Sequence, residues 1–130
     1  MSSIFTKIVQ GEIPSYKIYE DDKFLVFLDA FPLAKGHTLV IPKEEIDYLF
    51  DLPDSLYQEM QMLAKKIALA LKKAITCKRV GVAVLGLEVP HAHIHLVPMN
   101  SEADVNFKNP KLSFSPEEFV AIAEAIKAEL

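Results

Sequence analysis

Three histidines occupy alternate positions of one short apolar run, His91-Ala92-His93-Ile94-His95-Leu96-Val97. Side chains alternate between the two faces of a β-strand, so the three imidazoles are predicted to share one face. Ala92, Ile94 and Leu96 would then face a hydrophobic core. Imidazole has an ordinary pKa of about 6.5 and can act as nucleophile, acid or base near neutral pH. The row therefore predicts a reaction centre.

A purely structural role is the alternative interpretation, and it is the usual one for a single histidine on an apolar strand. Three neighbouring imidazoles repel one another when charged, and burying each of them costs free energy unless it has a hydrogen-bond partner. The triplet therefore favours a catalytic role for these histidines over a purely structural one. The same repulsion predicts that at least one of the three stays neutral and nucleophilic at pH 7.

A metal site is another alternative, because histidine is a common zinc ligand and Glu88 is a candidate additional ligand. On a strand the outer Cα atoms of His91 and His95 would lie about 13 Å apart. Metal–nitrogen bonds of ~2 Å would then require both outer rings to stretch fully toward each other. No second cluster of cysteine, histidine or carboxylate residues accompanies the row. We therefore rank a metal site below catalysis and expect no metal or other cofactor.

Length and composition describe one compact domain, 1–130, and restrict its partners. The chain has 130 residues, of which 51% are hydrophobic and 25% are charged. These values are typical of a globular protein and not of a disordered one. The net charge of -4 argues against a nucleic-acid binder, which needs a basic surface. A small anionic ligand requires only local positive potential and stays compatible with this charge.

Several further features favour a cytoplasmic location. Cys77 is the single cysteine, which excludes an internal disulfide and a cysteine-rich zinc site. The start of the chain has no charged segment followed by a long apolar one, so we expect no signal peptide. No apolar run reaches the ~20 residues needed to span a bilayer, so we expect no membrane partner.

The elements that position the histidines follow from hydrophobic periodicity. Hairpins outnumber strand–helix–strand crossovers, so we expect an α+β domain in which helices pack on a five-stranded antiparallel sheet. The sequence Ser115-Pro116-Glu117-Glu118 is a helix-start signal, with a capping serine, proline at the first helical position and a glutamate that completes a capping box. The predicted strands cover residues 16–20, 24–28, 38–42, 79–85 and 91–97, and the predicted helices cover about 4–10, 53–74 and 116–129.

The histidine row resembles the motif of the histidine triad (HIT) family of nucleotide hydrolases and transferases. Further blocks support the resemblance, and one of them places His37 where the family has an additional active-site histidine. The resemblance covers about residues 4–99 and leaves out the C-terminal helix at about 116–129. The supporting blocks are Ile4–Ile8, Glu12–Pro14, Phe27–Asp29 with Pro32, and Gly36–Lys43.

The resemblance implies a role for each histidine. His93 would attack the α-phosphorus of a nucleotide and form a nucleotidyl-histidine that water later releases. Its Nδ1 atom would be held by a backbone carbonyl, expected to be that of His91, so that Nε2 is free to attack. His95 would donate a hydrogen bond to non-bridging phosphate oxygens. His91 and His37 would form a supporting pair behind the nucleophile.

The resemblance also implies how a nucleotide is held. Asp29 would bind ribose hydroxyls, although it could equally be a turn residue. Phe5, Ile8, Ile13 and Phe27 match positions that line the base slot, and the residues alone are equally compatible with a core role. The implied substrate is a purine nucleotide containing adenosine, as a nucleoside phosphoramidate or a dinucleoside polyphosphate. Members of this branch are generally homodimers.

The segment before the triad departs from the family pattern. Leu87 and Glu88 stand where the family commonly has a glutamine followed by serine or threonine, and Leu85 replaces an asparagine. An ionised carboxylate beside a phosphate is repulsive. Our hypothesis is that Glu88 either turns away or serves as a protonated acid for the leaving group, with a solvent-facing turn residue as the alternative. The departures keep a non-catalytic nucleotide-binding module as an alternative function.

Overall fold

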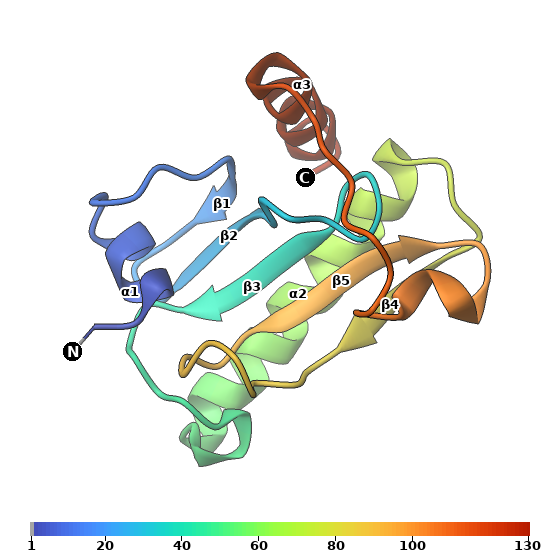
Figure 1. The fold of residues 1–130 in the computed structure, drawn as a ribbon. Helices are drawn as coiled ribbons and strands as arrows, with labels where there is room; N and C mark the ends of the chain where they lie inside the picture. The colour runs from blue at the N-terminus through green and yellow to red at the C-terminus, as the bar shows by residue number, and fades with distance from the viewer. Residues whose placement is uncertain (1) are drawn as a thin grey trace.

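The computed structural model describes residues 2–130, which form one antiparallel sheet with helices on both of its faces (Figure 1). The predicted fold class is confirmed. The elements are α1 (Ile4–Val9), β1 (Lys17–Glu20), β2 (Phe24–Leu28), β3 (Thr38–Pro42), the 3-10 helix η1 (Leu49–Asp51), α2 (Asp54–Ala74), β4 (Arg79–Ala83), β5 (Ile94–Met99), the 3-10 helix η2 (Glu102–Val105) and α3 (Pro116–Lys127).

The sheet has five strands in the order β1-β2-β3-β5-β4, and each neighbouring pair is antiparallel. β1 and β2 form the expected hairpin. β5 lies between β3 and β4, where His95 pairs with Leu39 on one side and with Ala83 on the other. The strand that carries the last histidine is therefore internal and held from both sides, which makes it a rigid mount.

The alternation of side chains divides the interior into two layers. The main core packs between the sheet and the helices α2 and α3, and it contains Ala92, Ile94 and Leu96 as predicted. The smaller second cluster lies on the opposite face and includes Phe5 and Ile8 from α1. Figure 1 shows α2 crossing behind the sheet, with α1 toward the viewer. The histidine face is therefore the face that α2 does not cover.

Helix boundaries agree with the sequence signals. The buried side chains of α2 include Met60, Ile67 and Leu71, which recur at helical spacing and face the sheet. The capping box of α3 is formed, because Ser115 Oγ accepts the Glu118 N–H at 3.1 Å and Glu118 Oε1 accepts the Ser115 N–H at 2.8 Å. Among residues 2–130 no helix has the combination of length and apolarity that crossing a bilayer requires.

Two predicted strand boundaries around the triad are wrong. β4 ends at Ala83 instead of Leu85, and β5 begins at Ile94, so His91 and His93 precede the strand. The backbone donors of this segment are used elsewhere: the His91 N–H binds the carbonyl of Val89 at 2.8 Å, and the Ala92 N–H binds that of Ile46 at 2.7 Å. A strand ladder cannot form where these donors are already engaged.

Candidate active site

All four histidines are buried and lie close together on the face opposite α2. Their relative exposures are 0% for His91, 1% for His37, 6% for His93 and 7% for His95. The ring centroids of His93 and His95 are 4.8 Å apart, and those of His37 and His95 are 5.2 Å apart. The ring of Phe5 contacts both His91 and His93, at 5.9 and 5.0 Å. The predicted sharing of one face is therefore confirmed, although only His95 belongs to the strand.

His93 has one nitrogen held by the backbone. Its Nδ1 lies 2.6 Å from the carbonyl oxygen of His91, which confirms the predicted partner. A carbonyl oxygen can only accept a hydrogen bond, so Nδ1 carries the proton and Nε2 has a free lone pair. The backbone thereby orients the ring and selects the nucleophilic tautomer.

A second chain of hydrogen bonds determines the protons of His37 and His95. The Leu33 N–H donates to His37 Nδ1 at 3.0 Å, so His37 carries its proton on Nε2. That nitrogen lies 3.0 Å from His95 Nδ1, which must then accept. His95 consequently keeps its proton on Nε2, where it can donate to an oxygen of a bound anion.

The predicted pairing of His91 with His37 is wrong, because His37 pairs with His95. The register of the sheet explains the difference. His37 comes directly before β3, where Thr38 pairs with Leu96, so it lies diagonally across from His95. His91 lies toward the other end of β3, where its Nε2–H donates to the carbonyl of Pro42 at 2.8 Å.

Burial keeps the histidine pair neutral. Desolvation lowers the pKa of His37 to about 4, and the positive charge of Lys111 lowers it further. Desolvation lowers the pKa of His95 to about 3, with smaller contributions from the charges of His93 and His37. Desolvation also lowers the pKa of His91. Both members of the His37–His95 pair are therefore neutral at pH 7, as their hydrogen bonds require.

His91 is bound to the start of α1 by a cluster that the sequence did not predict. Since His91 Nε2 donates to Pro42, its Nδ1 accepts the hydroxyl proton of Ser3 at 2.8 Å. Ser3 Oγ in turn accepts the Thr6 N–H at 3.0 Å as the cap of α1. The Thr6 hydroxyl donates to Glu45 Oε1 at 2.7 Å. No sequence signal pointed to this contact, because Ser3 and His91 are 88 positions apart.

Asp29 lies at the edge of the histidine cluster and also forms a turn. Its Oδ1 accepts the Phe31 N–H at 2.9 Å, which is the local turn bond expected of aspartate. Its Oδ2 lies 3.5 Å from His37 Nε2. Burial raises the pKa of this carboxyl, while the turn bond and the charges of His93 and Lys111 oppose the rise. Asp29 is therefore a turn residue at the edge of the histidine cluster, and its role toward ribose hydroxyls stays a prediction.

The predicted base-slot residues gather beside His93. Phe5, Ile8 and Phe27 are buried in the second apolar cluster, and Ile13 packs against it. The rings of Phe5 and Phe27 meet edge to face with centroids 5.7 Å apart. The four residues therefore form one apolar wall next to the nucleophile candidate, and their role toward a base stays a prediction.

The segment before the triad is exposed. Leu87 has a relative exposure of 93%, and Glu88 is also exposed, without a hydrogen bond or ion pair to any residue from 2 to 130. This segment borders a hollow that extends to His93. Aromatic side chains of η1 and α2 line the same hollow. The lining residues are Asp47, Tyr48, Leu49, Phe50, Tyr57, Gln61, Val84, Leu85, Gly86, Leu87, Ala92 and His93.

One cluster in the described chain has donor atoms suited to a metal ion. It consists of Asp29, His37 and His95, whose candidate ligand atoms lie within 4.8 Å of one another. It is not the set considered from the sequence, because His91 and His93 are outside it and Glu88 is not part of it. Binding a cation here would displace the proton that His37 and His95 share.

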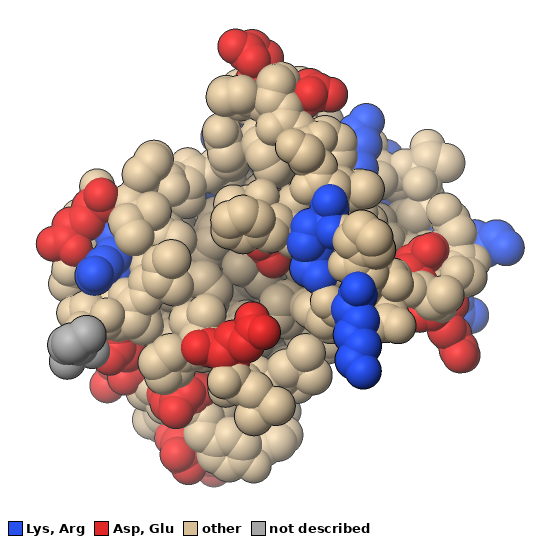
Figure 2. All heavy atoms as spheres, in the orientation of Figure 1, with Lys and Arg blue, Asp and Glu red and all other residues tan. Residues whose placement is uncertain are grey.

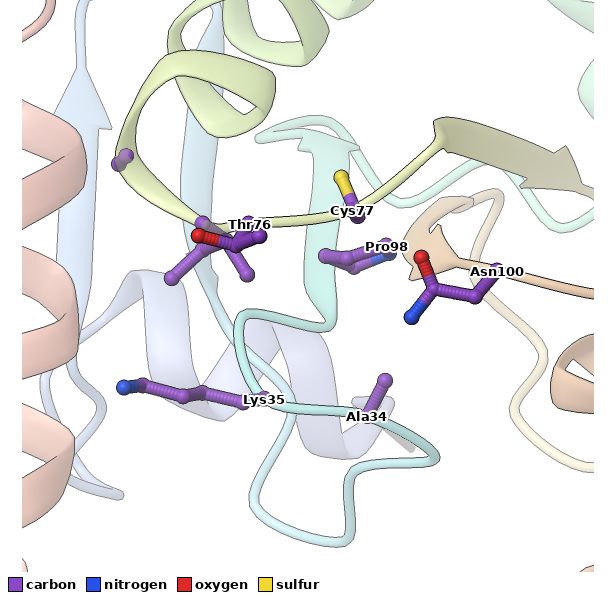
Figure 3. Close-up of a pocket in the computed structure, with 8 residues that line it drawn as sticks. Ala34, Lys35, Thr76, Cys77, Pro98 and Asn100 are labelled. Carbon is purple, nitrogen blue, oxygen red and sulfur yellow. The ribbon is translucent and has the colours of Figure 1, made fainter.

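A further hollow lies away from the histidines. Its lining contains the thiol of Cys77 and the amide of Asn100, but neither an imidazole nor a carboxylate (Figure 3). This hollow therefore lacks the imidazole and carboxylate groups that are found at the histidine face. The lining residues are Ala34, Lys35, Ala74, Ile75, Thr76, Cys77, Pro98 and Asn100.

Comparison with known proteins gives consistent matches. The HIT domain family model matches residues 10–102. An uncharacterized HIT-like protein of Borreliella burgdorferi is 38% identical, over 98% of this chain and 97% of its own. An adenosine 5'-monophosphoramidase of Schizosaccharomyces pombe is 37% identical, over 100% of this chain and 99% of its own. The crystal structure of a Hit-like protein from Bartonella henselae superposes with a TM-score of 0.87 at 33% identity, over 99% and 96% of the two chains.

Proposed function

Because the chain belongs to the HIT family, we propose that it hydrolyses or transfers the nucleotidyl group of an adenosine phosphoramidate or a dinucleoside polyphosphate. The observation that carries this proposal is the hydrogen bond from His93 Nδ1 to the His91 carbonyl. It leaves Nε2 unprotonated and fixes the orientation of the ring, which is what a nucleophile that attacks phosphorus needs. The similarity to a relative named adenosine 5'-monophosphoramidase supports a substrate that contains adenosine.

The reaction proceeds in two displacements at the α-phosphorus. In the first, the Nε2 lone pair of His93 forms a bond to phosphorus, and the bond to the leaving group breaks. The leaving amine or phosphate departs with the bonding electron pair and takes up a proton from the solvent. The phosphorylated ring of His93 then carries a positive charge, which the His91 carbonyl stabilises through the Nδ1 proton.

In the second displacement water attacks phosphorus and breaks its bond to His93. The products are the nucleoside monophosphate and the neutral ring, with its proton on Nδ1, and the attacking water releases a proton to the solvent. Throughout, His95 Nε2–H donates to a non-bridging oxygen, because its other nitrogen accepts from His37. Asp29 binds the ribose hydroxyls, and the apolar wall containing Phe5 and Phe27 packs against the base.

The test is intact-protein mass spectrometry after rapid mixing with adenosine phosphoramidate. The wild-type protein is expected to show a transient increase in mass of one adenosine monophosphate group, and His93→Ala is expected to show none. His37→Gln is the matched control, since it alters the cluster but keeps the nucleophile and should still form the adduct. Turnover without an adduct, or an adduct that persists in His93→Ala, would overturn the mechanism.

A non-catalytic nucleotide-binding module is the second candidate function. It is favoured by Leu87 and Glu88, which replace the glutamine and the serine or threonine that would contact the substrate in the family pattern, and by Leu85, which replaces an asparagine. The same protein samples distinguish the two functions by calorimetry. Binding of adenosine monophosphate together with an intact phosphoramidate after prolonged incubation would favour the binding module.

We further propose that the protein is a homodimer joined through the edge strand β4 and the adjoining face of α2. Val82, Val84 and Leu85 are exposed on this edge, and Met62 and Leu69 are exposed on α2. An unpaired strand edge with apolar side chains favours pairing with a second copy. Sedimentation of the wild-type protein is expected to give the mass of a dimer, and Val82→Lys should give a monomer.

A further inference from the structure

The segment between η2 and α3 contacts the histidine cluster although it lies outside the region that the family model matches, residues 10–102. The ring of Phe107 meets that of His95 edge to face, with centroids 4.7 Å apart and an interplanar angle of 70°. It also approaches the ring of His37, at 6.2 Å. Phe107 therefore closes the end of the histidine row that is farthest from Phe5.

This segment is held in place by Lys111. The ammonium group donates to the backbone carbonyl of Phe107 at 2.6 Å and to that of Asn109 at 3.0 Å. The next residue ties the segment to the loop before β3, because the Leu112 N–H donates to the carbonyl of Pro32 at 2.8 Å. The position of the ammonium group is therefore defined by the backbone, and a lysine held in this way is already ordered before a ligand binds.

The charge of Lys111 acts on the active site. Its positive charge opposes the rise that burial causes in the pKa of Asp29, and it adds to the lowering that burial causes in the pKa of His37, so its field reaches the two groups that border the phosphate-binding end of the row. An ammonium group has three N–H donors, and the two carbonyls account for two of them. In Figure 2 basic side chains lie beside the central hollow of this face, over the segment that follows β5.

The histidines alone are a poor site for an anion. His37 and His95 are neutral at pH 7, and the nearby carboxyl group of Asp29 repels a phosphate when it is ionised. The α-phosphate of a phosphoramidate carries a negative charge in the ground state and gathers more on its oxygens during attack. Its binding therefore needs a cation from outside the triad.

On the basis of the proposed function, we propose that Lys111 is that cation: its remaining N–H binds an α-phosphate oxygen opposite His95, and Phe107 and Asn109 position it. The site thus selects a nucleotide by its phosphate through a residue that the family motif does not contain. Because Lys111 contacts substrate in this proposal, its loss should weaken binding of phosphate-bearing ligands and spare the bare nucleoside.

The test compares adenosine monophosphate with adenosine by titration calorimetry on the full chain. Lys111→Met is expected to weaken binding of adenosine monophosphate by roughly tenfold to a hundredfold, and to leave adenosine affinity within about twofold. Lys111→Arg should retain most of the preference for phosphate. Lys108→Met is the matched control, since Lys108 is exposed on the same segment and should have no effect.

The outcomes separate this proposal from the proposed function. Wild-type protein that prefers adenosine monophosphate, with an equal preference in Lys111→Met, would overturn the role of Lys111 and leave the function intact. An equal loss of affinity for both ligands in Lys111→Met would mean that Lys111 acts only by holding the segment in place. That result would also overturn its role as the cation that binds the phosphate. Wild-type protein that binds neither ligand would overturn the proposed function and this proposal together.

Discussion

The Nε2 atom of His37 lies 3.0 Å from the Nδ1 atom of His95, and the other nitrogen of His37 accepts the backbone N–H of Leu33. A backbone amide has no alternative but to donate, so it determines the tautomer of His37 and, through His37, that of His95. The loop before β3 thus controls which nitrogen of His95 can donate to a substrate.

The first prediction concerns His37→Phe. The variant removes the group that donates to His95 Nδ1, so the proton of His95 can lie on either nitrogen. In the tautomer with the proton on Nδ1, His95 Nε2 cannot donate to a substrate oxygen. We expect kcat toward adenosine phosphoramidate to fall by roughly tenfold to a hundredfold. His37→Gln keeps an amide donor at this position and should retain more activity. Equal activity of His37→Phe and wild type in steady-state assays would contradict this role.

The second prediction concerns the contact between α1 and the triad. Ser3→Ala removes the hydroxyl that donates to buried His91 Nδ1 and also removes the cap of α1. We expect a loss of about 1–3 kcal/mol in the free energy of unfolding, measured by urea denaturation. We also expect a lower kcat, because His91 carries the carbonyl that orients His93.

Ser101→Ala is the matched control for this prediction, since Ser101 caps η2 away from the histidines. It should affect stability slightly and kcat not at all. A Ser3→Ala variant that loses stability while keeping the wild-type kcat would show that the contact supports only the fold.

Local patterns in the sequence were sufficient to predict most of the helices and strands. The residues 24–28 and 38–42 were predicted as strands with the observed bounds, because each is a short apolar run between turn residues. The start of α3 followed from its capping box. The contact of His93 Nδ1 with the His91 carbonyl was also predicted, and it spans only two positions along the chain.

The parts of the site that could not be predicted depend on contacts between distant segments. The pairing of His37 with His95 follows from the register of β3 on β5, which hydrophobic patterning does not specify to the residue. The contact of Ser3 with His91 and that of Phe107 with His95 have no local signal. The beginning of β5 was misplaced because the Ala92 N–H binds Ile46 in a distant loop.

The third prediction concerns acid stability. The pKa values of His37 and His95 are lowered by burial to about 4 and about 3, so between pH 6.5 and these values the unfolded chain binds protons that the folded chain does not. The free energy of unfolding should therefore fall as the pH decreases below 6.5, by up to about 1.4 kcal/mol per pH unit for each histidine.

Urea denaturation between pH 7 and pH 5 measures this slope, and His95→Asn should reduce it. Asp104→Asn is the matched control, because the lowered pKa of this carboxyl lies below the measured range. A stability that does not change over this range would show that the buried histidines become protonated without cost.

The fourth prediction concerns Glu88. Because its side chain is exposed and has no partner within residues 2–130, we expect it to turn away from the bound phosphate. Glu88→Ser should then change kcat/KM by less than about twofold for both a phosphoramidate and a dinucleoside polyphosphate. A selective loss with the phosphoramidate would instead support the alternative hypothesis, in which Glu88 protonates the leaving amine.

The fifth prediction concerns metal ions. Zinc bound to Asp29, His37 and His95 would replace the proton between the two imidazoles and take up the Nδ1 lone pair of His95. We therefore expect added zinc to inhibit phosphoramidate hydrolysis, a chelator to leave the activity of the purified protein unchanged, and Asp29→Asn to reduce the inhibition. Steady-state rates with zinc and with chelator measure all three effects. Activity that disappears with chelator and returns with zinc would mean that the cluster is a catalytic metal centre, and the mechanism through a free His93 would then have to be abandoned.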